Sequence, residues 1–72
     1  MRFAIVLEKS AGGYGACVPD LPGCVAVAES EAEVREMIRE AIGFHLQAMR
    51  EDGEPIPEPA TRVEYVEIRH AA

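Results

Sequence analysis

The sequence predicts one α+β domain with the element order β-β-β-α-β, in which an antiparallel sheet carries one long helix on one face. Three observations support this. Short runs of alternating polarity, separated by glycine- and proline-containing turns, fill the first 28 residues. Apolar residues then recur at helical spacing from residue 34 to residue 49. A β-branched run follows near the end of the chain. With 72 residues and no internal repeat, we expect a single domain over residues 1–72.

The first three predicted strands cover residues 1–9, 14–18 and 24–28. In the first of them, alternate residues share one face, namely Phe3, Ile5 and Leu7. A turn at residues 10–13 makes the first connection a hairpin. Three antiparallel strands in succession form a meander.

The segment from Pro19 to Gly23 predicts a rigid turn between the second and third strands. The two prolines, Pro19 and Pro22, fix two φ angles and remove two backbone donors. Asp20 is expected to cap this turn by bonding the backbone two residues further on, and Gly23 is expected to adopt a positive φ. The turn would then present Leu21 outward or into a groove.

The predicted helix begins at Ser30, where Ser30-x-x-Glu33 forms a capping box. Glu31 and Arg35 have the favourable i,i+4 orientation, which contributes roughly 0.3–0.5 kcal/mol. Gly53 is a natural stop signal for the helix. The expected apolar face comprises Val34, Met37, Ile38, Ala41, Ile42, His45, Leu46 and Met49.

After the helix, residues 53–60 carry three prolines and predict an extended connector or, alternatively, an arm that docks a partner. Residues 61–69 predict the last strand. Its apolar residues fall on both parities, so it contains a bulge or is covered on both faces, and the second option indicates a subunit interface. The last three residues, 70–72, are expected to form a frayed tail.

The chain carries seven basic and thirteen acidic residues, for a net charge of −6. This balance disfavours nucleic acid as a partner, unless Arg2, Arg62 and Arg69 gather on one surface. It suits a basic protein partner, although moderate acidity also serves solubility alone. A core this small favours self-association, so we expect a homo-oligomer, either a dimer or a tetramer. The apolar run at residues 3–7 is too short for a signal peptide or a membrane span, which indicates a cytoplasmic protein.

Candidates for chemistry are few. His45 lies within the apolar helix stripe without an assignable orienting partner, so a structural role is favoured over that of a general base. Cys17 and Cys24 lack a C-x-x-C spacing, and we expect reduced, structural thiols rather than a redox pair. No metal site, no cofactor and no enzymatic activity are expected. The alternative is a pocket between subunits that contains His45 or Asp20.

The pattern Tyr14-x-Ala16-x-Val18-Pro19-Asp20-Leu21-Pro22-Gly23-Cys24 resembles the signature of the HicB-like antitoxin family, which includes the small UPF0150-type domains. The resemblance continues through the helix and into residues 52–59. It therefore covers nearly the whole chain.

The resemblance implies a partly degenerate ribonuclease-H-like fold without catalytic acids. It also implies a function, which is to bind and mask a small basic HicA-like toxin that cleaves mRNA. Full-length antitoxins continue into a DNA-binding segment, whereas this sequence ends at Ala72, so we expect a stand-alone domain. The alternative is an orphan oligomeric domain with a ligand-binding or enzymatic role at a subunit interface.

Carried over by motif, the candidate partner-binding residues lie in and around the turn. Pro22 and Gly23 would shape the turn, Leu21 would insert into a neighbouring molecule, and Tyr14 would pack against the helix. Each of them could instead serve the fold alone. The full set is Tyr14, Asp20, Leu21, Pro22, Gly23 and Cys24.

Overall fold

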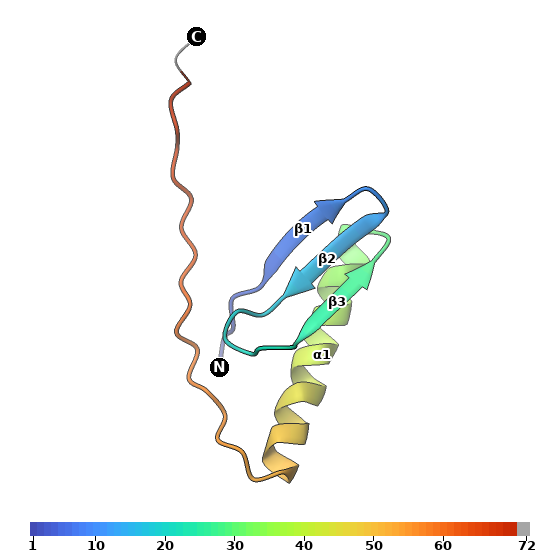
Figure 1. Ribbon diagram of the computed structural model, residues 1–72, viewed down its shortest axis with the longest axis vertical. Coiled ribbons are helices and arrows are strands. Elements are labelled where there is room, and N and C mark those ends of the chain that lie inside the picture. Colours follow the sequence, from blue (N-terminus) through green and yellow to red (C-terminus); the bar gives the residue numbers. More distant parts are fainter. Residues whose placement is uncertain (71–72) are drawn as a thin grey trace.

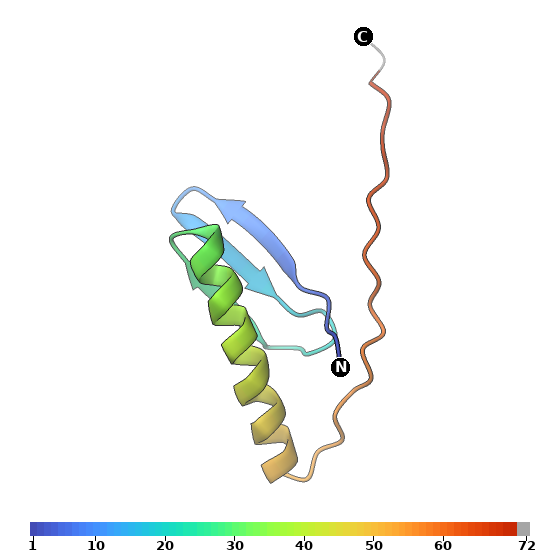
Figure 2. The same cartoon turned by 180° about the vertical axis from the view of Figure 1, so that it is seen from behind.

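A computed structural model describes residues 1–70 of the protein and contains three strands followed by one long helix (Figure 1). The elements are β1 (Val6–Ser10), β2 (Gly13–Cys17), β3 (Val25–Ala28) and α1 (Glu31–Glu51). The strands form an antiparallel meander in the order β1-β2-β3, and α1 lies across one face of it (Figure 2). The predicted α+β class and the first four elements are confirmed. Ala71 and Ala72, at the end of the tail expected to be frayed, lie outside the described residues.

The first strand is shorter than predicted, because pairing with β2 begins only at Val6. The residues before it still contribute to the core. Phe3, Ile5 and Leu7 are all partly buried and pack against the core cluster, as their shared parity predicted.

The core lies between α1 and the helix-facing side of the sheet. Its largest fully buried side chains are Leu21, Val34 and Ile38, each at most 1% exposed. Alanines stand opposite one another on β2 and β3, where Ala16 pairs with Ala26. Their small side chains leave room for α1 to approach the sheet. The remaining buried residues are Val18 and Cys24.

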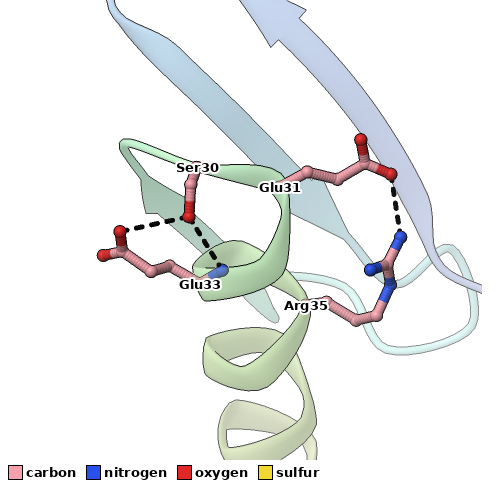
Figure 3. Close-up of polar contacts among 4 residues, drawn as sticks. All are labelled: Ser30, Glu31, Glu33 and Arg35. Carbon is pink, nitrogen blue, oxygen red and sulfur yellow. Dashed lines mark hydrogen bonds and ion pairs between the residues drawn. The ribbon is translucent and has the colours of Figure 1, made fainter.

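The helix begins as predicted (Figure 3). The Ser30 hydroxyl oxygen accepts a hydrogen bond from the Glu33 backbone N–H at 3.1 Å. The Glu33 carboxylate accepts from the Ser30 hydroxyl, also at 3.1 Å, instead of from the Ser30 backbone N–H of a standard capping box. Arg35 pairs with Glu31 at 2.8 Å on the exposed surface, which confirms the predicted ion pair.

The predicted stop signal, Gly53, lies directly after the end of α1 and its C-cap residue. Gly53 has a φ of 71°, in the left-handed region. The Gly53 N–H donates to the Arg50 carbonyl at 3.1 Å, and the Glu54 N–H donates to the Met49 carbonyl at 2.8 Å. These two bonds form a Schellman motif, which satisfies carbonyls that the helix end leaves open.

The predicted last strand is not formed within one chain. No ladder of hydrogen bonds includes residues 61–69, and the segment runs extended beside the sheet and beyond it (Figure 1). The fifth element of β-β-β-α-β is therefore corrected to an extended C-terminal arm, residues 61–70. Its apolar side chains are exposed because no element of the same chain covers either of its faces: Val63 by 56%, Tyr65 by 96%, Val66 by 76% and Ile68 by 72%.

Candidate protein-interaction surface

The face of the sheet opposite α1 is uncovered (Figures 1 and 2). The register places two rows of side chains on it, each running across the three strands. Three valines dominate this face and are 40%, 61% and 72% exposed at residues 6, 25 and 27. We call this surface the open sheet face, and it comprises Val6, Glu8, Gly15, Cys17, Val25 and Val27.

The open sheet face is hollowed as well as apolar. The central strand contributes only Gly15 and Cys17 to it, so the flanking valines stand above its middle. A shallow depression of about 230 Å³ lies over these residues. This apolar surface is a candidate site of protein–protein contact.

An exposed aromatic residue adjoins this face. Phe44 of α1 is 71% exposed and lines a hollow together with His45 and Val25, and Val25 also belongs to the open sheet face. Phe44 lies outside the apolar stripe predicted for the helix, and no role was predicted for it. The sequence does contain a signal for Phe44, because it is an aromatic residue on a side of the helix where the other residues are polar or small.

The hollow beside His45 bears on the predicted alternative of a catalytic pocket. Apart from His45 and the buried thiol of Cys24, the residues that line the hollow carry no ionisable group. Within residues 1–70, no hydrogen bond orients the imidazole of His45. Within residues 1–70, the hollow therefore supplies His45 with no orienting carboxylate, and a pocket completed by a second subunit stays a prediction.

Three of the six predicted motif residues lie in the core or pack against it, namely Tyr14, Leu21 and Cys24. Leu21 is 1% exposed and belongs to the protein's own core, which corrects the expectation that it points outward or inserts into a neighbouring molecule. Tyr14 is half-buried and packs against the core cluster, and its predicted contact with the helix stays a prediction. Pro22 and Gly23 are exposed, and Gly23 has the predicted positive φ, at 86°.

Both cysteines are free thiols. Cys24 is buried, and burial raises the pKa of its thiol above the ordinary value of 9.0. Cys17 lies half-buried on the open sheet face. Within residues 1–70, no three side chains of the His, Cys, Asp and Glu types gather closely enough to hold a metal ion. In the same part of the chain, α1 has neither the apolar content nor the length of apolar run that crossing a bilayer requires.

Asp20 has a different partner from the one predicted. Its Oδ2 accepts hydrogen bonds from the backbone N–H groups of Ala60 and Thr61, at 3.1 and 3.0 Å. Its Oδ1 accepts from the Thr61 hydroxyl at 2.8 Å. The expectation that Asp20 caps its own turn is therefore wrong, because backbone bonds among Val18, Leu21 and Cys24 hold that turn. Asp20 instead fastens the start of the C-terminal arm to the sheet domain.

This contact predicts a pH dependence. The Thr61 backbone N–H and hydroxyl, together with the Ala60 N–H, hold the pKa of Asp20 below its ordinary value of 3.8. A depressed native pKa adds stability above the unfolded pKa, and that stability is lost as the pH falls through the native pKa. We expect Asp20→Asn to lower the free energy of unfolding at pH 7, and the difference from wild type to shrink once the pH falls below about 4. Urea titrations at a series of pH values measure this.

Asp52→Asn is the matched control, because Asp52 is an exposed carboxylate at the helix end whose side chain makes no hydrogen bond within residues 1–70. The difference in unfolding free energy between Asp52→Asn and wild type should not depend on pH in the way expected for Asp20→Asn. Equal profiles for the two variants would mean that the contact of Asp20 with Thr61 contributes nothing to folding.

Comparison with known proteins agrees with this geometry. The family described as "HicB_like antitoxin of bacterial toxin-antitoxin system" matches residues 3–70. An uncharacterized 14.9 kDa protein of Haemophilus phage HP1 is 36% identical over 66 residues, which are 92% of this chain and 50% of the phage protein. This chain thus spans half the length of that relative. A UPF0150 protein of Archaeoglobus fulgidus is 47% identical over 57 residues, covering 75% of this chain and 83% of the relative.

A solved structure shares the fold. A chain of the HicA3 and HicB3 toxin-antitoxin complex superposes with a TM-score of 0.71 at 27% sequence identity. The match covers 83% of this chain and 70% of the other.

Proposed function

Because this chain belongs to the HicB-like antitoxin family, we propose that it acts as an antitoxin, by binding and masking a small basic mRNA-cleaving toxin of the HicA type. The role is that of a protein-binding module and not of an enzyme. The observation that carries the proposal is the open sheet face, an uncovered apolar surface on the sheet of a chain that resembles a protein solved with a toxin.

The open sheet face and Phe44 together supply the contact area. Protein interfaces have an apolar centre in which aromatic residues are enriched, and Phe44 would be such an anchor at the border of the valine-lined depression. Glu8 is the acidic group on this face and would meet a cation of the toxin.

Charge favours a basic partner. The net charge of −6 would steer a cationic protein towards this chain and accelerate encounter at low ionic strength. RNA and an acidic antitoxin would then compete for the same basic surface of the toxin, which is how binding would block cleavage.

The experiment uses a purified HicA-type toxin from the same genome, with calorimetric titration and an RNA-cleavage assay. We expect Val27→Asp to weaken binding at least about tenfold, because a carboxylate on the open sheet face would be desolvated in the interface. Val27 is 72% exposed, so the free protein should fold normally.

Met37→Asp is the matched control, since Met37 is an apolar residue of α1 that is 43% exposed away from the open sheet face. It should bind the toxin within about threefold of wild type. The proposal fails if the toxin neither binds nor is inhibited. Equal weakening by both variants would refute the open sheet face as the site.

A further inference from the structure

The edge of β3 that faces away from β2 is unpaired. Within residues 1–70, β3 pairs with β2 alone, and the strand order β1-β2-β3 places it at a border of the sheet. This border lies on the side of the sheet away from the C-terminal arm (Figure 1). An unpaired strand edge is a template on which an extended segment of another chain can form a strand.

The register of the sheet identifies the backbone groups that this edge offers. The Val18 N–H donates to the Cys24 carbonyl at 3.2 Å, so the backbone of residue 24 faces β2. Hydrogen-bonded pairs alternate with non-bonded pairs along antiparallel strands, so Ala26 also bonds β2. The N–H and C=O groups of Val25 and Val27 therefore point away from β2, towards the open edge. Together they offer two donors and two acceptors to an added strand.

Apolar surface adjoins this edge on both faces of the sheet. On one side stand the exposed side chains of Val25 and Val27, which belong to the open sheet face. On the other side, Phe44 and Ala41 of α1 line a hollow of about 410 Å³ together with Gly23 at the approach to β3. Side chains of a strand alternate between its two faces. An added strand would thus place one set beside the valines and the other set in the hollow.

Acidic residues stand at the two ends of this edge. Glu29 follows β3 directly, and Glu40 lies one turn before Phe44 on the same side of α1, and both are exposed. If two copies paired antiparallel through both valines, Glu29 would stand opposite Gly23, which lines the hollow beside Phe44. Glu29 and Glu40 of the two copies would then approach each other, and such like-charge contacts disfavour association. The edge therefore favours a cationic chain over a second copy.

We propose that the toxin contributes an extended segment that adds to β3 as a fourth strand of the sheet. This inference rests on the proposed antitoxin function and gives it a binding mode. Main-chain hydrogen bonds at Val25 and Val27 supply affinity, and the surfaces on either side select the side chains of the segment. The segment carries a bulky apolar side chain for the hollow beside Phe44 and a cationic side chain near Glu29 or Glu40. The rest of the toxin covers the open sheet face.

Amide hydrogen exchange in the full chain tests the main-chain bonds. NMR follows it with and without a purified HicA-type toxin from the same genome. In the free protein, the Ala26 N–H should be protected by the ladder, whereas those of Val25 and Val27 should exchange quickly. Saturating toxin should slow exchange at Val25 and Val27 at least about tenfold. The matched control is the Leu7 N–H, which points out of the opposite edge because its partner Ala16 bonds β3 instead, and the toxin should leave its exchange unchanged.

A proline variant tests the same bonds through affinity. Val27→Pro removes an N–H that makes no hydrogen bond to β2, so the sheet should keep its own ladder. In calorimetric titration it should bind the toxin at least about tenfold more weakly than Val27→Ala, which shortens the side chain but keeps the N–H. Circular dichroism shows whether both variants are folded. If Val27→Pro does not fold, the exchange measurement on wild type decides.

The outcomes distinguish this inference from the function on which it rests. A toxin that neither binds nor is inhibited overturns both. A toxin that binds and is inhibited, while the Val25 and Val27 amides exchange as fast as in the free protein, refutes the added strand and leaves the antitoxin function standing. Equal affinities for folded Val27→Pro and Val27→Ala would refute the added strand in the same way.

Discussion

Replacing Leu21 with alanine is expected to lower the free energy of unfolding by about 2–5 kcal/mol, the range for truncating a fully buried leucine. Leu21 is 1% exposed and, within residues 1–70, is one of the three largest side chains that are fully buried. With so few large side chains in the core, little surrounding structure can collapse to fill the cavity. Since small domains are marginally stable, a loss of this size should leave a substantial fraction of the variant unfolded at 37 °C.

Urea unfolding followed by circular dichroism measures the effect. Protein concentration must be the same for all variants, because the self-association expected from the sequence would make apparent stability depend on concentration. Val27→Ala, which truncates an exposed residue of the sheet, is the control and should change stability by less than about 0.5 kcal/mol. A loss for Leu21→Ala no larger than that of the control would show that Leu21 is not a core residue in solution.

Gly23→Val is the second substitution with a large expected effect, a loss of about 1–3 kcal/mol. Gly23 has a φ of 86°, and a Cβ added there would meet nothing within 4 Å. The penalty would thus come from the backbone conformation and not from a clash. Because the turn places Leu21 and Cys24 in the core, strain in it should also loosen the packing beneath.

Gly12→Val is the matched control, since Gly12 also has open space around an added Cβ but does not have a left-handed φ. Gly12→Val should lower the thermal midpoint of unfolding by less than Gly23→Val does. Gly23→Asn should lie between wild type and Gly23→Val, because asparagine tolerates the left-handed region better than valine does. Equal midpoints for the two valine variants would mean that the turn does not require a positive φ.

Local patterns predicted the local structure well. The cap at Ser30, the ion pair between Glu31 and Arg35 and the stop at Gly53 all depend on residues at most four positions apart, and all are present. The three strands and the helix follow from periodicity in the same way. The family resemblance rested on the residues around the rigid turn, and it too is confirmed.

Contacts over long sequence separations were not predictable. Nothing in the pattern around Asp20 indicates a partner about 40 residues away, and the local capping role expected for it was wrong. The burial of Leu21 was likewise not predictable from local sequence. A residue in a proline-containing turn is expected to be exposed, and Leu21 is buried because it packs in one cluster with residues of α1. The sequence also could not show that Phe44 borders an uncovered valine surface, since that depends on where α1 crosses the sheet.

Residues 61–69 show most clearly what the sequence determined and what the tertiary structure decided. Sequence alone determined that residues 61–69 favour an extended backbone with apolar side chains on both parities, because β-propensity and alternation are local properties. Tertiary structure decided that no strand within residues 1–70 pairs with this segment. A strand forms only where a second backbone supplies its hydrogen bonds, and the hold of Asp20 on Thr61 sets the arm beside the edge of β1 without pairing to it.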